Sequence, residues 1–184
     1  MDWSTILIGT LAGGVALFLW GMAAWMALPH HHDDFGALKN DEEVARALAQ
    51  GGALPGMYLV PSYKSYAQGH KDPAFLERWK RGPNGYLVLF RPGPCMNPRA
   101  MLYGFLLDLA IAFGGTLVLS MTGDRLHALV DKWLFFAGLG FLVHATPLFA
   151  HSIWMGTPWR HTLTLTLDGI VAFSLLAIVL HHVT

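Results

Sequence analysis

Charged residues are scarce in this chain, and the two signs cancel. Only 13% of its 184 residues are charged, and twelve basic side chains balance twelve acidic ones. That share is about half of what an average soluble domain carries. It excludes a disordered chain, which needs high charge and little hydrophobicity. It also excludes a nucleic-acid-binding protein that depends on net basic charge.

Cysteine is nearly absent as well. The single residue Cys95 allows neither an intrachain disulfide nor a four-thiolate zinc site. The sequence contains no P-loop, no dinucleotide-binding glycine motif, no serine-hydrolase elbow, no zinc-protease helix and no haem-attachment motif. These absences identify no reaction and leave the cofactor unknown, and a catalytic role is not favoured.

Long apolar runs are what the chain has instead, since 54% of its residues are hydrophobic. Four runs reach the ~20 helical residues that cross a hydrocarbon core of ~30 Å. Their apolar residues are consecutive rather than alternating, which indicates helices and not strands. They cover residues 5–28, 100–121, 133–155 and 162–183. The sequence thus predicts an all-α membrane protein with four transmembrane helices.

The first run, residues 5–28, differs from a cleaved signal peptide. No basic segment precedes it and no A-x-A-like cleavage site follows it, so we expect a retained helix. An even number of crossings places both termini on one side of the membrane. Basic residues in the short loops favour the cytoplasm for the termini, although two arginines just before the second span favour the reverse.

Tryptophans support these boundaries. We expect Trp3 and Trp133 at one membrane interface and Trp25, Trp154 and Trp159 at the other, as in the aromatic belts of membrane proteins.

Residues 29–99 separate the first span (1–28) from the remaining three (100–184), and their composition changes sharply to glycine, proline and charge. We expect a small α+β extramembrane domain, inserted between helices 1 and 2. About 70 residues bury only a small core, so the domain is marginal by itself.

Local signals predict the elements of this insertion. Asn40 followed by Glu43 predicts a capping box and a helix that ends at the glycines 51–52. Asp72 and Pro73 predict the start of a second helix. Two short apolar runs between turn residues, 57–60 and 86–90, predict strands that pair.

Ionisable side chains inside a membrane are costly, so each one marks a candidate site. The predicted spans contain Asp108, His144, His151 and Asp168. Helical rise places Asp108, His144 and Asp168 at similar depths of ~9–16 Å, whereas His144 and His151 stand ~10.5 Å apart and cannot share one metal ion or one haem. The favoured interpretation is hydrogen bonding to histidine, threonine or tryptophan of another helix; the alternative is an ion, haem or proton site. Pro147 predicts a kink between the two histidines.

A second candidate site directly follows the first span. The run contains His30, His31, His32, Asp33 and the adjacent Asp34, and we expect His151 and His161 to approach the same level. Imidazoles with carboxylates can bind zinc, copper or nickel. The run lacks the i,i+4 spacing of a helical metal site, so a polar loop at the headgroup level is the favoured interpretation.

Small residues in the first span, Gly9 and Gly13, form a G-x-x-x-G motif that lets another helix approach closely. The sequence leaves open whether that helix belongs to this chain or to another subunit.

Residues 20–31 (WGMAAWMALPHH) resemble the first-helix exit of a family of small, uncharacterised bacterial inner-membrane proteins. Residues 56–61 (GMYLVP), 81–83 (RGP) and His144 continue the likeness. The resemblance implies a four-helix bacterial inner-membrane protein with a short extramembrane domain. It implies no activity and no catalytic residues.

These observations favour a non-catalytic accessory or structural subunit of a larger membrane complex. Its expected partners are the lipid bilayer and other membrane subunits, not nucleic acid, and residues 29–99 are expected in the periplasm. The alternative is a metal- or haem-binding membrane redox protein that uses His144 with Asp108 and Asp168, or the histidine run.

Overall fold

A computed structural model describes residues 1–63, 65, 69 and 71–184. Its contacts divide the chain into two units. The bundle unit contains Met1–Phe35 and Met96–Thr184, and the insertion unit contains Gly36–Cys95. Residues 29–35 of the predicted insertion therefore pack with the helices, and this places the histidine run in the bundle unit.

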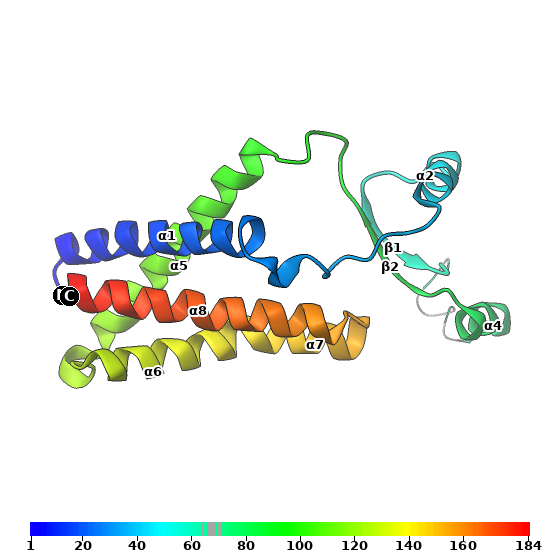
Figure 1. Cartoon of the computed structure of the whole chain (residues 1–184). Helices are drawn as coiled ribbons and strands as arrows, with labels where there is room; N and C mark the ends of the chain where they lie inside the picture. The colour runs from blue at the N-terminus through cyan, green and yellow to red at the C-terminus, as the bar shows by residue number, and fades with distance from the viewer. Residues whose placement is uncertain (64, 66–68, 70) are drawn as a thin grey trace. The chain divides into compact units, whose positions relative to one another are not determined.

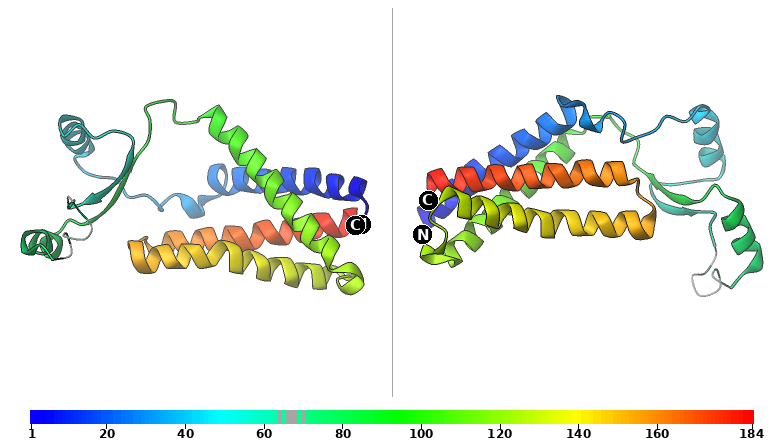
Figure 2. Two further views of the ribbon diagram at one scale, coloured as in Figure 1. Left: turned by 180° about the vertical axis from the view of Figure 1, so that it is seen from behind. Right: turned by 60° about the horizontal axis from the view of Figure 1, so that its bottom comes forward.

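The bundle unit contains four helices that are long and apolar enough to cross a membrane. They lie within a few residues of the four predicted spans, and both termini lie at the same end of the bundle unit (Figures 1 and 2). The bounds are α1 Trp3–Met26, α5 Pro98–Met121, the third helix Leu129–Met155, which includes α6 Leu129–Gly140 and α7 Thr146–Met155, and α8 Trp159–Val183.

Local signals explain where these helices begin and end. The Asp2 carboxylate caps α1 by accepting a hydrogen bond from the Thr5 N–H at 2.8 Å. Asn97 caps α5 through the Arg99 N–H at 3.0 Å, and Pro98 occupies the first helical position. Gly156 ends α7 with φ of 71°, a left-handed conformation that glycine adopts without strain.

Small residues bring α1 close to its neighbours. A Cβ at Gly13 would lie 2.7 Å from a Leu176 methyl group, and one at Gly9 would lie 2.9 Å from Leu180. The G-x-x-x-G face is therefore occupied by α8 of the same chain, together with α5. The buried core beside it consists of Leu17, Ala112, Leu119, Phe136, Leu176, Ala177 and Leu180.

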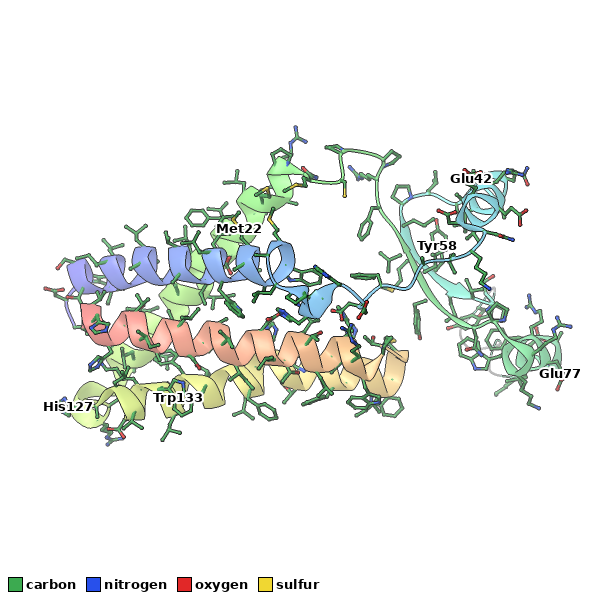
Figure 3. The ribbon with its side chains drawn as sticks, viewed as in Figure 1. Met22, Glu42, Tyr58, Glu77, His127 and Trp133 are labelled. Carbon is green, nitrogen blue, oxygen red and sulfur yellow. The ribbon has the colours of Figure 1, made fainter. Side chains whose placement is uncertain are left out.

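Helix α5 packs mainly on α1 and crosses it obliquely, while α6 packs along α8 (Figures 1 and 2). Trp133 of α6, labelled in Figure 3, bonds to α8, because its indole N–H donates to Ser174 Oγ at 3.0 Å. Only 17–33% of the residues in each apolar window are buried inside the protein, so most of the apolar side chains face outward.

The third helix is interrupted by a π-helical turn, Phe141–Ala145, between α6 and α7. Pro147 follows directly and cannot donate a backbone hydrogen bond to the preceding turn. The sequence predicts a disturbance here, and the structure shows its form as a widened turn that contains His144. Such π-turns occur frequently at functional sites.

The described residues of the insertion unit form two helices, α2 Asp41–Gln50 and α4 Pro73–Arg81, and an antiparallel pair of strands, β1 Gly56–Val60 and β2 Gly85–Leu89. The predicted strand pairing is confirmed, with Tyr58 opposite Leu87. Asp72 caps α4 through the Ala74 N–H at 2.9 Å, as predicted.

The predicted start of α2 after Asn40 and its end at the glycines 51–52 are confirmed, but the capping box itself does not form. Asn40 occupies the cap position without a side-chain hydrogen bond to the backbone. Its amide instead donates to the Glu43 carboxylate at 3.3 Å, so the two side chains satisfy one another rather than the helix end.

Candidate metal centre

The chain turns sharply after α1, and this turn positions two imidazoles. Leu28 is extended, and Pro29 begins a short 3-10 helix, Pro29–His31. The His31 ring stacks on Trp25, with ring centroids 4.0 Å apart and planes 3° apart. The turn and the stack hold the buried His31 against α8.

Both histidines of the turn contact one carboxylate of α8. His30 Nε2 lies 2.9 Å from Asp168 Oδ1, and His31 Nε2 lies 2.6 Å from Asp168 Oδ2. The Trp20 indole N–H donates to the Asp168 carbonyl oxygen at 3.2 Å, which fixes this part of α8 against α1. Asp168 is buried, with 9% of its surface exposed.

A second carboxylate, Asp34, holds the opposite side of the His31 ring. His31 Nδ1 donates to Asp34 Oδ2 at 2.6 Å, and His161 Nδ1 donates to the same oxygen at 2.8 Å. Arg160 donates to Asp34 Oδ1 at 2.8 Å and Thr164 to Oδ2 at 3.2 Å. The Asp34 side chain is fully buried by these donors.

These contacts shift two pKa values outside the predicted spans. Burial alone lowers the pKa of His31, but its hydrogen bonds to Asp34 and Asp168 outweigh burial and raise the pKa above the ordinary 6.5. Burial raises the pKa of Asp34, yet hydrogen bonds from His31, His161 and Thr164 outweigh it and lower the pKa to about 2. Both ring nitrogens of His31 lie 2.6 Å from carboxylate oxygens, which accept hydrogen bonds, so the geometry favours an imidazolium that bridges the two carboxylates.

A cavity of about 180 Å³ adjoins Asp168. Its lining is mostly apolar and comes from α1, α5, α8 and the π-helical turn. Asp108 and His144 also line it, so three of the four ionisable residues in the predicted spans share one space. A Cβ at Gly169 would overlap the His144 ring, which shows that this ring rests directly on the backbone beside Asp168.

No family model, curated protein or solved structure matches this chain.

Several residues of the predicted polar cluster lie elsewhere than expected. Asp168 is bonded to the histidines of the turn, and neither to His144 nor to a threonine. Asp108 is half-buried at the cavity and has no hydrogen bond within the described part of the chain. His144 lines the cavity with a largely exposed side chain, whereas His151 is exposed and does not line the cavity.

The members of the predicted histidine run lie in two different environments. His30 and His31 face Asp168, whereas His32 and Asp33 are exposed. Asp33 makes one peripheral ion pair, to Arg160 at 3.4 Å. These four residues of the run therefore do not converge on one point, because the 3-10 turn directs His30 and His31 towards Asp168 and leaves His32 and Asp33 exposed.

Two groups of side chains offer metal-ligand atoms that converge. The first is His30, His31 and Asp168, and the second is His31, Asp34 and His161; in each group the three ligand atoms lie within 4.8 Å of one another. The groups share His31. The second group already holds a guanidinium against Asp34, which disfavours another cation there. The first group borders the cavity.

The contact between the two predicted sites could not be seen in the sequence. Residues 31 and 168 are 137 positions apart, and no periodic pattern connects a loop to a distant helix face. Asp34 and Arg160 carried no distinctive spacing either. The one available signal was depth, since Asp168 and His161 belong to the same end of α8 as the loop that follows α1.

Proposed function

We propose that this chain is an integral membrane protein with a mononuclear divalent-metal centre formed by His30, His31 and Asp168. The observation that carries the proposal is the convergence of two imidazole Nε2 atoms on one carboxylate, at 2.9 and 2.6 Å. Ligand atoms of an octahedral ion with bonds of ~2.1 Å are about 3.0 Å apart. The three ligand atoms lie within 4.8 Å of one another, so an ion would draw them together towards this separation.

In this proposal Asp34 does not bind the ion but orients the ligand His31. Histidines that bind metals usually donate the other ring N–H to a carboxylate, which fixes the tautomer and the ring orientation. His31 does this through Nδ1 and Asp34. Arg160, His161 and Thr164 in turn hold Asp34. An ion would replace the proton on His31 Nε2, and Asp34 would keep the ring in place.

The ligand set indicates the class of metal. Two imidazoles and one carboxylate suit Zn²⁺ or Fe²⁺, and three protein ligands leave open coordination positions. Such sites support Lewis-acid or oxygen chemistry rather than a purely structural role. The cavity beside Asp168 gives space for a small ligand. Haem finds no support, because its plane does not fit between two rings that converge on one carboxylate.

Metal binding to the purified, metal-stripped chain in detergent tests the proposal. We expect one Co²⁺ or Zn²⁺ per chain by elemental analysis, and a visible spectrum for Co²⁺ that reports imidazole ligands. His30→Gln removes a ligand from a partly exposed position and is expected to lower the affinity at least about 100-fold.

His32→Gln is the matched control, because His32 is the same residue type in the same run and is exposed. It is expected to leave stoichiometry and spectrum unchanged. Equal binding by wild type and His30→Gln, or no binding by a folded wild type, contradicts the proposal.

A second candidate function, the accessory subunit, is favoured by two glycines that face outward. The described structure has no atom within 4 Å of a Cβ built on Gly114 of α5 or Gly138 of α6. Flat faces of this kind let helices of another subunit approach closely. Gly9 and Gly13 no longer support this function, because α8 occupies them.

The test of this second function is co-purification from native membranes. If another subunit covers these faces, Gly114→Leu with Gly138→Leu should abolish its co-purification while the variant still binds metal. Unchanged partners, or no partner in the wild type, contradict the accessory function.

The membrane location belongs to the same proposal. Four apolar helices support a multi-pass protein, and the resemblance of residues 20–31 supports the bacterial inner membrane. In the proposed orientation the termini lie in the cytoplasm, and the insertion unit and the metal centre lie on the periplasmic side. Reporter fusions at residues 2, 60, 126 and 184 test it, and opposite sides for residues 2 and 184 would refute it.

A further inference from the structure

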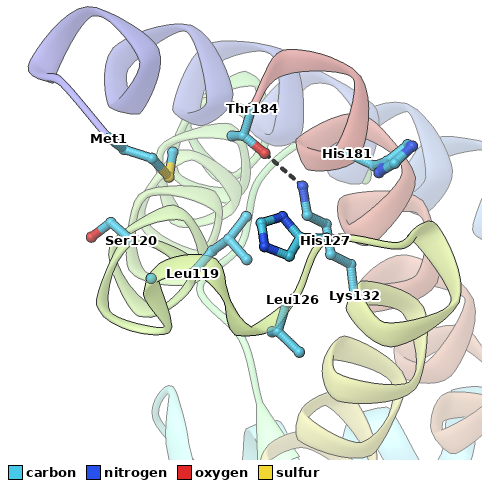
Figure 4. A pocket seen from close by; sticks show the side chains of 9 residues that line it. Met1, Leu119, Ser120, Leu126, His127, Lys132, His181 and Thr184 are labelled. Carbon is cyan, nitrogen blue, oxygen red and sulfur yellow. Dashed lines mark hydrogen bonds between the residues drawn. The ribbon is translucent and has the colours of Figure 1, made fainter.

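The end of the bundle unit that carries both termini contains a second, larger cavity. Its volume is about 350 Å³, and Leu119, Leu126, His127, Lys132 and His181 are among its lining residues (Figure 4). Ser120 and Thr184 add hydroxyl groups. The cavity lies where α5 ends, α6 begins and α8 ends, which is the boundary of three predicted spans.

Lys132 is the unusual member of this lining. It is 6% exposed, and its ammonium donates to Thr184 Oγ1 at 2.8 Å (Figure 4). Among the described side chains no carboxylate forms an ion pair with it. A buried cation without an anion is costly, so the described side chains leave this ammonium to be balanced by another negative group.

His181 provides an independent sign of an absent partner. Its Nδ1 atom is buried and has no hydrogen-bond partner among the described residues. Buried polar nitrogens are nearly always bonded, and an orphan usually indicates an unseen ligand or water. An ammonium and two imidazoles around one cavity form a set of hydrogen-bond donors, and such a set suits phosphate oxygens.

We propose that this cavity binds the phosphate of an anionic phospholipid in the leaflet on the side of the termini. Three observations support the lipid rather than a protein: the cavity opens at the end of apolar helices, leucines line it beside the donors, and its volume suits a headgroup. Basic pockets between membrane helices on the cytoplasmic side bind anionic lipid headgroups elsewhere. This inference rests on membrane insertion and not on the metal centre.

The experiment is a titration of delipidated protein in a neutral detergent. Short-chain phosphatidylglycerol, short-chain phosphatidylcholine and inorganic phosphate are compared by native mass spectrometry and by calorimetry. Wild type is expected to prefer phosphatidylglycerol. Lys132→Met keeps the apolar stem, removes the charge, and should lower that affinity about fivefold or more, while Lys132→Arg should retain most of it.

Arg125→Gln is the matched control, because Arg125 is an exposed cation of the same connection that does not line the cavity. It should leave the preference unchanged. If Lys132→Met does not fold, His127→Gln removes another donor of the same cavity from an exposed position and should also lower the affinity for phosphatidylglycerol.

Three outcomes overturn the inference. If wild type and Lys132→Met bind phosphatidylglycerol with equal affinity, the cavity is not the binding site. If Arg125→Gln loses as much affinity as Lys132→Met, the lipid binds through general surface charge instead. Binding of inorganic phosphate as tightly as the lipid, with the same dependence on Lys132, overturns the lipid as occupant. Metal stoichiometry in the same samples is expected to stay constant, so failure here is distinguishable from failure of the metal centre.

Discussion

At one end of the bundle unit two buried carboxylates, Asp34 and Asp168, meet two cationic side chains, His31 and Arg160. At the other end Lys132 meets only a hydroxyl group among the described side chains. The first end balances its charge among its own side chains, and in the proposed metal centre an ion would take the place of one proton. At the second end the described side chains provide no carboxylate that pairs with Lys132, and the proposed lipid phosphate would compensate its charge.

The two ends show two different arrangements of buried charge, each with its own effect on stability. A balanced network holds its groups in fixed positions, and removing one member leaves the others without compensation. An unbalanced cation destabilises the unliganded protein and thereby favours an anionic ligand. Substitutions at the two ends should therefore change stability in opposite directions, and the predictions below test that contrast.

The largest effect is expected at Asp34. Asp34→Asn removes the charge that Arg160, His31 and His161 share, and the side chain is fully buried. We expect a loss of about 3 kcal/mol in the free energy of unfolding, measured by denaturant unfolding in mixed micelles. Asp33→Asn is the control, because the Asp33 side chain is 84% exposed and its removal should cost less than about 0.5 kcal/mol. Similar losses in the two variants would contradict a balanced network.

The next effect concerns the backbone beside the metal centre. Gly169→Ala places a methyl group on the His144 ring, and overpacking of this kind costs about 1–3 kcal/mol. Gly138→Ala, on an open helix face, should instead be neutral or stabilise by up to about 1 kcal/mol. Thermal unfolding of both variants measures the difference. Equal behaviour would show that His144 does not rest on α8.

A smaller effect of opposite sign is expected at the other end. In protein stripped of lipid, Lys132→Met replaces an uncompensated buried cation by an apolar side chain of similar length. It should leave stability unchanged or raise it by about 1 kcal/mol. Adding phosphatidylglycerol should then stabilise the wild type but not the variant. Clear destabilisation of the stripped variant would show that the ammonium is already compensated.

The smallest effect is expected from a change of pH. The pH dependence of stability should differ between metal-free and metal-loaded protein. The pKa of His31 is raised by folding, so its stabilising contribution is complete below the ordinary 6.5 and is lost as pH rises through the raised value. The Asp34 contribution is present above the ordinary 3.8 and is lost only as pH falls towards its lowered pKa of about 2.

Metal-free protein should therefore become less stable as pH rises past the raised His31 pKa, and His31→Gln should lack this slope. Metal affinity should rise over the same interval, because ligand nitrogens must be unprotonated. Melting temperatures from pH 5 to 9, with and without Zn²⁺, measure both trends. A metal-free protein whose stability is independent of pH in this interval would contradict the bridging imidazolium.

The sequence was informative where single segments decide the structure. Consecutive apolar runs predicted the four helices, and Asp72 with Pro73 predicted the start of α4. Segments that meet only after folding were less predictable. Asp168 was expected beside His144 because both were assigned similar depths, yet the 3-10 turn after Pro29 brings His30 and His31 to it first.

The cluster around Asp34 shows a second limit. Its partners come from the loop after α1 and from the first turns of α8, and none of the pairs has a helical spacing except His31 with Asp34. Similarly, Gly9 and Gly13 predicted a close helix contact, but α8 as the partner follows only from the complete packing of the bundle.

The π-helical turn at Phe141–Ala145 rotates the side chains of α7 about the helix axis relative to those of α6. An α-helix advances about 100° per residue, so the extra residue in this turn rotates all of α7 relative to α6. Gly140 faces α8 before the turn, and Ser152 faces it after the turn through its hydrogen bond to Thr162 at 2.5 Å. Losing one residue here would restore a continuous α-helix of ordinary hydropathy and length, yet Ser152 would swing away from α8. A gap in an alignment of related chains is therefore informative at this place, since it would mark chains that have lost the His144 wall of the cavity while remaining four-helix proteins.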